Sequence, residues 1–281
     1  MERVLVGIAS LVFGLPLEAA AIALGRRVGL LDIPTEIKPH AKPVPFTGGS
    51  AVTVIIVATA VGLGNVSLAL AAAGVWLIGF LDDVRSLPPL SKLVVEILLL
   101  TLWAISLPIS LSESVIAVAA GAILINSFNV IDGLDGLAAG CALAPLLVLT
   151  TLPGGAGVIA AAGVGSVLAF LFFNRPPARV FLGDEGSLVL GFFLWALPLV
   201  GGFTLGGARE ALVWTFLWLF PLVNASFVIL YRLSAGRPVL RGDRSHLYDF
   251  WRGRYGLGAT LVACWSIAGA GAIAAFVIRL P

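Results

Sequence analysis

A short stretch in the middle of the chain carries four side chains suited to metal and phosphate chemistry. The segment Asn126-Ser-Phe-Asn129-Val-Ile-Asp132-Gly-Leu-Asp135-Gly-Leu interleaves two carboxamides and two carboxylates with glycines, between two long apolar runs. On helical backbone, Asn126, Asn129 and Asp132 share a face, as do Asp132 and Asp135. Carboxylate and amide oxygens are ligands that suit Mg²⁺ or Mn²⁺. The alternative is a glycine-rich turn in which Asn and Asp serve the backbone.

Two further polar segments between apolar runs are acidic. Asp82 and Asp83 are adjacent at the end of one run, and like charges this close need a proton or a cation to relieve them. The segment Gly183-Asp184-Glu185-Gly186-Ser187 directly precedes another run, where a helix N-terminus presents free N–H groups to phosphate. Asp184 is therefore a candidate metal ligand. The alternatives are a solvated pair of aspartates and a simple helix cap.

The remaining two polar segments are basic. Residues 30–49 contain four prolines, which forbid a regular helix and predict a rigid loop that meets an anionic head group. Residues 237–249 hold the highest density of arginine in the chain, and arginine forks match phosphate oxygens. The candidate phosphate-binding side chains of the two segments are Lys42, His40, Arg241, Arg244 and His246. Ordinary positive loops with a structural histidine are the alternative.

Composition identifies the elements that must position these segments. The chain has 281 residues, of which 59% are hydrophobic and only 11% charged, and its mean hydropathy is +1.07. Soluble domains have about 25% charged residues, so the sequence predicts an all-α, polytopic membrane protein with one domain over 1–281. A net charge of +2 and the lack of any nucleic-acid-reading motif argue against a nucleic-acid partner. Cys141 and Cys264 lie in apolar runs and are predicted to be packing thiols.

About ten apolar runs are long enough to be candidate transmembrane helices, with some tilted or partly re-entrant. The predicted spans are 4–24, 47–63, 66–81, 90–107, 113–127, 136–152, 156–173, 186–204, 210–231 and 256–279. A secretory signal peptide is the alternative for the first run, although its basic residues follow the apolar stretch rather than precede it.

The basic residues predict an orientation. All but three of the 17 lysines and arginines fall in the loops after the odd-numbered spans or at their helix ends; the exceptions are Arg3, Arg209 and Arg279. The positive-inside rule then places these loops in the cytoplasm and both termini outside. No carboxylate lies near a predicted bilayer midplane, where ion-coupled transporters bind their substrates. This pattern favours an enzyme that joins a cytosolic substrate to a membrane lipid.

Five motifs on alternate loops together resemble the polyprenyl-phosphate N-acetylhexosamine-1-phosphate transferases, a glycosyltransferase 4 family of membrane enzymes. The motifs are Leu31-Asp32-x-Pro34…His40…Pro43-x-Pro45…Gly48-Gly49; Asp82-Asp83; Asn126-x-x-Asn129-x-x-Asp132-Gly-x-Asp135-Gly; Phe181-x-Gly183-Asp184-x-Gly186-Ser187; and Asp243-Arg244-Ser245-His246. The first loop is similar to the N-acetylglucosamine branch. The last motif departs from the family pattern, because Tyr248 and Asp249 stand where further histidines are common.

The resemblance implies a reaction and its partners. A UDP-N-acetylhexosamine, most often UDP-N-acetylglucosamine, would donate its sugar phosphate to undecaprenyl phosphate and release UMP, with Mg²⁺ or Mn²⁺ as cofactor. The protein would lie among the lipids of the bacterial cytoplasmic (inner) membrane with its active site facing the cytoplasm, and a homodimer is one expectation. The product, a lipid diphosphate-sugar, begins a cell-envelope polysaccharide.

The resemblance also implies roles for individual residues. The metal ligands would be Asp184 and Asn129. The residues that hold uracil would be Asp135, Asn174 and Phe181, with Phe181 as a stacking plate. The residues that meet the diphosphate, the sugar or the lipid phosphate would be Arg241, Arg244, His246, Lys42 and His40. Asp132 would be linked to the metal.

The chemistry of the acceptor bears on the mechanism. A phosphate monoester has a second pKa of about 6 and is largely dianionic at neutral pH, which favours direct attack over a covalent aspartyl-phosphate intermediate. Asp82 or Asp83 is then expected to orient or deprotonate the acceptor. The rival readings are a lipid-phosphate transporter or flippase that makes no bond, a CDP-alcohol phosphotransferase, whose Asp-Gly-x-x-Ala-Arg motif is absent here, and a silent scaffold.

Overall fold

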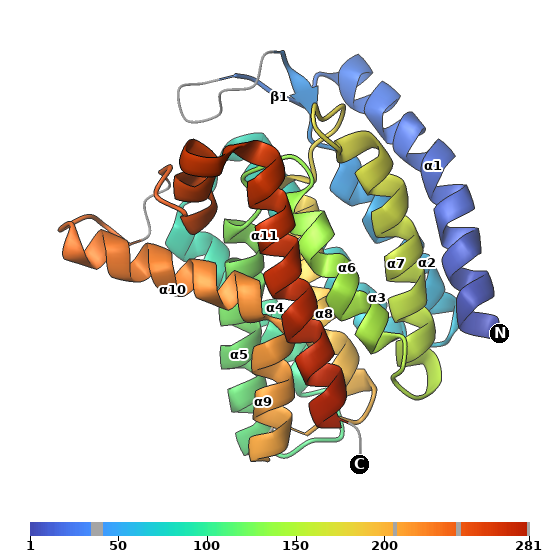
Figure 1. Ribbon diagram of the computed structural model, residues 1–281. Coiled ribbons are helices and arrows are strands. Elements are labelled where there is room, and N and C mark those ends of the chain that lie inside the picture. The colour runs from blue at the N-terminus through green and yellow to red at the C-terminus, as the bar shows by residue number, and fades with distance from the viewer. Residues whose placement is uncertain (35–41, 205–206, 240–242, 280–281) are drawn as a thin grey trace.

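The computed structural model describes residues 1–34, 42–204, 207–239 and 243–279, and within these it is all-helical apart from two short strands (Figure 1). The helices of the described residues are α1 (Glu2–Val28), α2 (Gly48–Gly62), α3 (Val66–Arg85), α4 (Pro89–Ala104), α5 (Leu111–Val130), α6 (Leu137–Leu149), α7 (Gly154–Asn174), α8 (Gly183–Val200), α9 (Ala208–Leu217), α10 (Leu219–Ser234) and α11 (Leu247–Arg279). The strands β1 (Leu31–Asp32) and β2 (Val44–Pro45) form an antiparallel pair.

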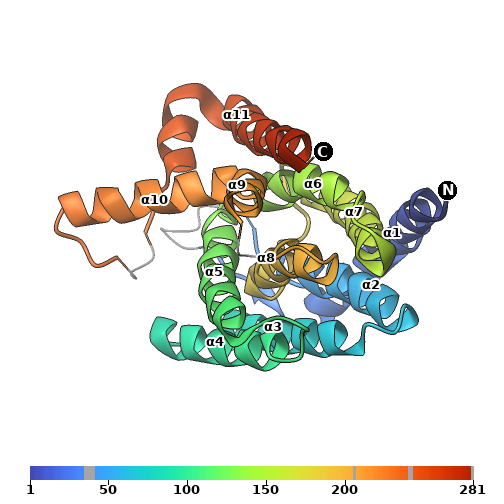
Figure 2. The same cartoon turned by 90° about the horizontal axis from the view of Figure 1, so that it is seen from below.

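Helix α8 is the core of the molecule. Viewed along the bundle, it lies in the middle with the other helices around it (Figure 2). Its sequence is apolar on every side, as expected for a helix buried by neighbours all round. Phe192, Phe193 and Trp195 are completely buried, and Trp103 of α4 packs edge-on against Trp195 with ring centroids 5.2 Å apart. This packing therefore holds the first residues of α8 in a fixed position.

The outer helices present apolar side chains to their surroundings. Leu5, Phe13, Leu70 and Ile273 are each more than half exposed, which in water would be costly and in a bilayer is favourable. Six described helices are long and apolar enough to cross a membrane, and the bent pair α9–α10 could supply a seventh. The chain is thus a polytopic integral membrane protein. Each of the ten predicted spans falls on a helix or helix pair, although several of these helices are shorter than a full crossing.

The predicted span 210–231 is wrong as a single helix. The chain bends by 79° between α9 and α10, and α10 runs crosswise to the bundle (Figure 1). Trp218 at the bend has non-helical dihedral angles. Pro221 explains the break, because a proline has no N–H to donate and its ring clashes with the carbonyl four residues earlier, here that of Leu217, the last residue of α9.

The last helix also differs from the prediction. Helix α11 begins at Leu247, nine residues before the expected start of the span at 256, and its path is kinked at Gly256, where φ is +81° and ψ is 169°. Residues 247–255, predicted as part of a loop, therefore form a separate helical segment. The side-chain oxygen of Asn224 in α10 accepts a hydrogen bond from the Leu247 N–H (3.1 Å), which fixes the start of this segment.

The five polar segments gather at one end of the bundle, here called the loop end. The connections α3–α4, α5–α6 and α7–α8 and the described parts of α1–α2 and α10–α11 lie there, while the described chain ends lie toward the other end (Figure 1). Close backbone contact brings α2 and α8 together at the loop end. A Cβ on Gly49 would lie 2.4 Å from the Gly186 Cα, so only glycine fits at this crossing.

Candidate active site

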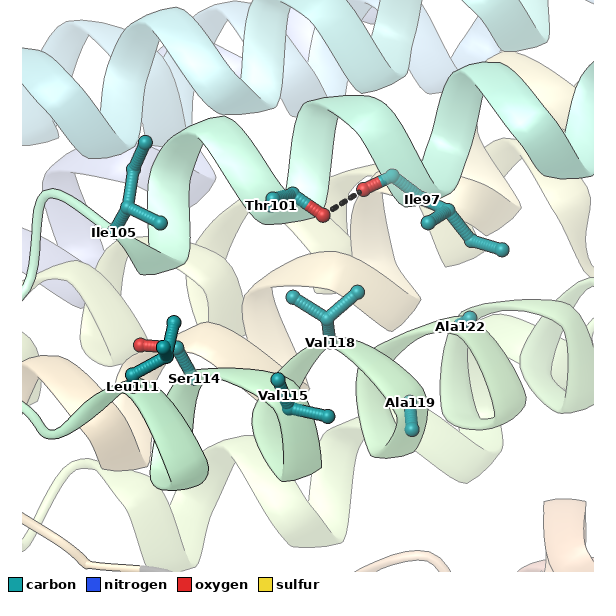
Figure 3. Close-up of a pocket in the computed structure, with 9 residues that line it drawn as sticks. All are labelled: Ile97, Thr101, Ile105, Leu111, Ser114, Val115, Val118, Ala119 and Ala122. Carbon is teal, nitrogen blue, oxygen red and sulfur yellow. Dashed lines mark hydrogen bonds between the residues drawn. The ribbon is translucent and has the colours of Figure 1, made fainter.

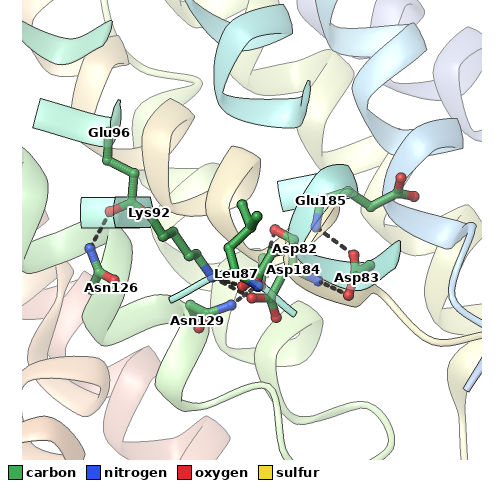
Figure 4. A network of polar contacts seen from close by, with 10 residues as sticks. Asp82, Asp83, Leu87, Lys92, Glu96, Asn126, Asn129, Asp184 and Glu185 are labelled. Atoms are coloured by element: carbon green, nitrogen blue, oxygen red, sulfur yellow. Dashed lines mark hydrogen bonds and ion pairs between the residues drawn. The ribbon is translucent and has the colours of Figure 1, made fainter. Parts of the chain in front are cut away.

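A lysine joins two aspartates from different segments at the loop end. Lys92, on the first turn of α4, places its Nζ 2.8 Å from the Asp82 Oδ2 and also contacts the Asp184 Oδ2 (Figure 4). The other oxygen of Asp82 accepts the backbone N–H of Leu87 at 2.6 Å. The Asp184 side chain keeps 33% of its surface exposed, so a ligand can reach it. One cation thus balances part of the charge of two carboxylates that come from α3 and α8.

Asp83 binds backbone N–H groups, whereas the adjacent Asp82 binds Lys92. Its two carboxylate oxygens accept the backbone N–H groups of Asp184 and Glu185, each at 3.0 Å. These are N–H groups of the first turn of α8, which have no partner within their own helix. Gly183, with φ +71°, lets the chain turn into α8 directly beside this carboxylate. Asp83 therefore fixes the backbone that carries Asp184.

The central motif contributes from the end of α5. Asn129 lies beside Asp184 (Figure 4) and its Nδ2 donates to the Ser187 Oγ at 2.8 Å. Asn126, one turn earlier, points to α4 instead, where its Nδ2 donates to the Glu96 Oε2 at 2.5 Å. The half-buried Asp132 follows in the turn, and its backbone N–H donates to the Asn129 carbonyl at 3.0 Å.

The donor set can be compared with what a divalent ion requires. Among the described residues, no three His, Cys, Asp or Glu side chains are gathered so that they alone could hold a metal. Asp184 and Asn129 are nevertheless adjacent and partly exposed, and each carries an oxygen atom of the kind that hard cations prefer. Mg²⁺ characteristically takes one or two protein ligands and completes its shell with water and substrate phosphates. The residues present fit this mode and not a closed, all-protein site.

Three residues predicted to hold a base lie around the α7–α8 connection. Asn174 is buried, and both ends of its amide are used: its Oδ1 accepts the Gly136 N–H at 2.7 Å and its Nδ2 donates to the Val180 carbonyl at 2.8 Å. The Asp135 Oδ2 accepts the Ala178 N–H at 2.9 Å. These bonds tie the central motif to the α7–α8 connection.

Phe181 links the α7–α8 connection to the α1–α2 connection. Its N–H donates to the Pro45 carbonyl at 2.7 Å, and its carbonyl accepts the Gly48 N–H at 3.1 Å. The Phe181 side chain is half-buried. Lys42 is exposed on the same loop, just before β2. The predicted phosphate contact His40 lies outside the described residues.

The described residues before and at the start of α11 pack against the central motif between α5 and α6. The Tyr248 hydroxyl donates to the Val130 carbonyl at 3.2 Å, and a Cβ on Gly133 would clash with that hydroxyl. Arg244 pairs with Asp249 at 2.8 Å, and Asp243 accepts from Arg232 of α10 at 2.9 Å. The predicted diphosphate contact Arg241 lies outside the described residues.

His246 sits between these ion pairs as a neutral ring. It stacks on Tyr248 with centroids 4.9 Å apart and an interplanar angle of 6°. Burial, reinforced by the positive charge of Arg232, lowers the pKa of His246 to about 4. The imidazole is therefore uncharged at neutral pH, and its buried Nδ1 has no hydrogen-bond partner among the described residues. A neutral imidazole can donate from one nitrogen and accept at the other.

Two members of the cluster were missed by sequence reasoning. Lys92 and Glu96 are not among the candidate site residues predicted from the sequence. Both are almost completely buried, at 7% and 1% exposure. Their spacing in the sequence could have revealed them. Two charged residues four positions apart in an apolar run share one face of a helix, where each requires a partner.

An apolar groove opens beside the polar cluster. It lies between α4 and α5, encloses about 320 Å³, and is lined at one end by Ile97 and Ala122 and at the other by Ile105 and Leu111 (Figure 3). Ile97 directly follows Glu96, and the Asn126 amide donates to the Ala122 carbonyl at 3.0 Å. The groove therefore begins where the polar cluster ends and runs along the faces of α4 and α5 away from the loop end.

Comparison of the sequence with known proteins shows which proteins this chain resembles. A sequence model described as glycosyl transferase family 4 matches residues 65–202. The decaprenyl-phosphate N-acetylglucosaminephosphotransferase of Mycolicibacterium smegmatis is 30% identical, with 80% of this chain and 69% of that protein aligned. The undecaprenyl-phosphate alpha-N-acetylglucosaminyl 1-phosphate transferase of Thermotoga maritima is 29% identical over 84% and 78%. A probable undecaprenyl-phosphate N-acetylglucosaminyl 1-phosphate transferase of Bacillus subtilis is 27% identical over 79% and 69%.

Proposed function

This chain belongs to glycosyl transferase family 4, and from that premise we propose that it transfers N-acetylglucosamine-1-phosphate from UDP-N-acetylglucosamine to a polyprenyl phosphate. An oxygen of the lipid phosphate attacks the phosphorus next to the sugar. The bond from that phosphorus to the UMP oxygen breaks, and the products are UMP and a lipid diphosphate-sugar. The names of these relatives support the sugar and the polyprenyl acceptor.

One observation carries the proposal: a polar cluster that contains a buried lysine adjoins an open apolar groove. Lys92 neutralises Asp82 and Asp184 at the loop end, and the α4–α5 groove starts one turn farther along α4. A substrate with an anionic head and a long isoprenoid tail matches this junction. Catalysis of phosphoryl transfer consists mainly of positioning and charge neutralisation, which a rigid cluster with a cation can supply.

We assign Mg²⁺ to Asp184 and Asn129, the residues that would hold it. When bound, it neutralises charge on the diphosphate. Asp83 holds the α8 N-terminus so that Asp184 faces this position. Lys92 supplies a further positive charge for the phosphates, and Asp82 orients that ammonium group.

The loop end is assigned to the cytoplasmic face of a bacterial inner membrane. It carries most of the lysines and arginines, while Arg3, Arg209 and Arg279 lie on helix ends away from it. In this arrangement the ten predicted runs cross or enter the bilayer, and both described chain ends face outward. A nucleotide-sugar made in the cytoplasm then reaches the cluster directly.

The reaction is tested with purified protein, undecaprenyl phosphate, Mg²⁺ and a panel of donors. UDP-N-acetylglucosamine is expected to release one UMP for each lipid diphosphate-sugar formed. The other donors are UDP-N-acetylgalactosamine, their 6-deoxy relatives and UDP-muramoyl-pentapeptide, each expected to be slower. If no donor yields UMP while the protein moves polyprenyl phosphate across liposome bilayers, the transporter reading replaces this one.

Filling the groove tests where the acceptor tail lies. Ala119 lines the groove on α5, so Ala119→Phe is expected to raise the KM for undecaprenyl phosphate about tenfold, equivalent to about 1.4 kcal/mol of lost apolar contact. The KM for UDP-N-acetylglucosamine is expected to stay unchanged. The control is Ile116→Phe on the same helix, an exposed position outside the groove. An equal effect of both substitutions, or none of Ala119→Phe, contradicts this placement.

A further inference from the structure

The connection between α5 and α6, residues 131–136, is here called the central turn. It carries Asp132 and Asp135 and begins two residues after Asn129. The α7–α8 connection supports one side of it, through the hydrogen bonds of Asp135 and Gly136 described above. Helix α11 contacts it as well, at two points, and the proposed mechanism assigns no role to this helix. The two contacts therefore require a separate explanation.

The first contact holds the entry to the central turn. Tyr248, the second residue of α11, is only 2% exposed. Its hydroxyl donates to the carbonyl of Val130, the last residue of α5, at 3.2 Å. Val130 directly follows Asn129, the assigned metal ligand. A Cβ on Gly133 would collide with the same hydroxyl, so the turn lies directly against this side chain. Tyr248 therefore sets the position at which the chain enters the turn.

The second contact holds the exit from the central turn. Trp265, farther along α11, donates its Nε1–H to the Gly136 carbonyl at 3.2 Å. Gly136, with φ +75°, is the last residue before α6. A Cβ on Gly140, one helical turn into α6, would collide with the Trp265 nitrogen, so α6 and α11 are in close contact there. One helix thus holds the central turn at both of its ends.

Helix α11 reaches both ends of the central turn because it bends between the two contacts. Gly256 lies about midway between Tyr248 and Trp265 and adopts φ +81° and ψ 169°, dihedral angles that are essentially restricted to glycine. In a straight helix the two aromatic residues would be about 25 Å apart along the axis. The stretch from Val130 to Gly136 spans at most about 21 Å even when fully extended. The bend brings the two contacts to a separation that the turn can match.

We propose that the kinked helix α11 positions the central turn for the transfer reaction, with Tyr248 at one end of the turn and Trp265 at the other. The inference rests on the proposed transferase function. Both side chains act through the backbone of the turn, so they are positioning residues. They fix the places of Asn129 and Asp132, and a displacement of about 1 Å in such groups can cost on the order of a hundredfold in rate.

Replacing Gly256 tests the bend without changing either contact residue. A Cβ at this position would meet nothing within 4 Å, so Gly256→Ala acts through the backbone angles alone. The variant is expected to lower turnover about tenfold and to raise the Mg²⁺ concentration for half-maximal rate about fivefold. The KM for undecaprenyl phosphate is expected to stay unchanged, because the groove lies between α4 and α5. The matched control is Gly258→Ala, where the surroundings are equally open and φ is not positive.

Two conservative variants test the contacts themselves. Tyr248→Phe removes the hydroxyl, and Trp265→Phe removes the indole N–H. Each is expected to raise the Mg²⁺ concentration for half-maximal rate about fivefold, the size of one lost hydrogen bond, with the KM for undecaprenyl phosphate again unchanged. A role in folding alone would not move the Mg²⁺ requirement. Tyr255→Phe, at an exposed position on the same helix, is the control.

The outcomes separate this inference from the function on which it rests. If wild-type protein is active and Gly256→Ala, Tyr248→Phe and Trp265→Phe all keep its Mg²⁺ requirement, α11 does not position the turn. Equal losses in Gly258→Ala and Gly256→Ala also contradict the inference, because they would show that any change in this helix is harmful. A wild-type protein that releases no UMP from any donor instead contradicts the proposed function, and the inference with it.

Discussion

Asp184→Ala is expected to lower turnover about a thousandfold, the size of effect seen when one preorganised electrostatic contact to a transition state is lost. Asp184 stands on the first turn of α8, partly exposed and in contact with Lys92. It also lies beside Asn129, so its loss removes the charged ligand of the assigned metal position. Turnover is measured as UMP release at saturating donor and acceptor.

Two further measurements connect this loss to the metal. Asp184→Asn keeps the shape of the side chain, and it is expected to be nearly as inactive and to need a higher Mg²⁺ concentration for its residual rate. Glu113→Gln, far from the cluster, is the control for expression and handling. Near-wild-type turnover of Asp184→Ala in unchanged Mg²⁺ would reject the metal role.

Lys92→Met is expected to reduce turnover at least about a hundredfold and to destabilise the protein by about 2 kcal/mol. The methionine fills the same space but leaves Asp82 and Asp184 facing each other without a cation. Removing one partner of a fully buried pair costs about 3–5 kcal/mol, and the exposed part of Asp184 reduces that figure. Stability is followed by thermal unfolding, and activity by UMP release.

A double variant separates the two effects of Lys92. Lys92→Met with Asp82→Asn removes one positive and one negative charge, so most of the lost stability is expected to return. Turnover is expected to stay low, because the acceptor phosphate still lacks the ammonium group. Recovery of activity together with stability would show that Lys92 serves the fold alone.

Much of the architecture was predictable because membrane helices are encoded by composition. Nine of the ten predicted runs each fall on one helix and the tenth falls on the α9–α10 pair, and the alternation of polar loops correctly predicted that the described motif residues lie at one end. The broken α9–α10 pair was not predicted, since residues 210–231 are continuously apolar and Pro221 alone marks the break. Proline near the start of a helix is ordinary, so its position signals a bend only once the path of the chain is known.

The motif residues were identified more readily than their partners. Asp82, Asp184 and Asn129 were predicted as one site, and they do lie together. Asp83 could not be distinguished from Asp82, because adjacent side chains on a helix end point in different directions that only the packing of α8 defines. The contact between Thr47 and Ala21 depends on the pairing of α1 with α2, which no local pattern specifies.

Helix α10 runs away from the bundle, and this direction bears on how the amount of acceptor lipid in the membrane limits the reaction rate. Helices α4 and α10 extend on either side of α5 (Figure 2), whose outward residues Val115 and Ile123 are more than half exposed. A polyprenyl phosphate that enters along this side never leaves the bilayer, so its encounters are governed by its number per unit area of membrane. Diluting it with inert phospholipid then slows the enzyme even when its molarity in the tube is constant.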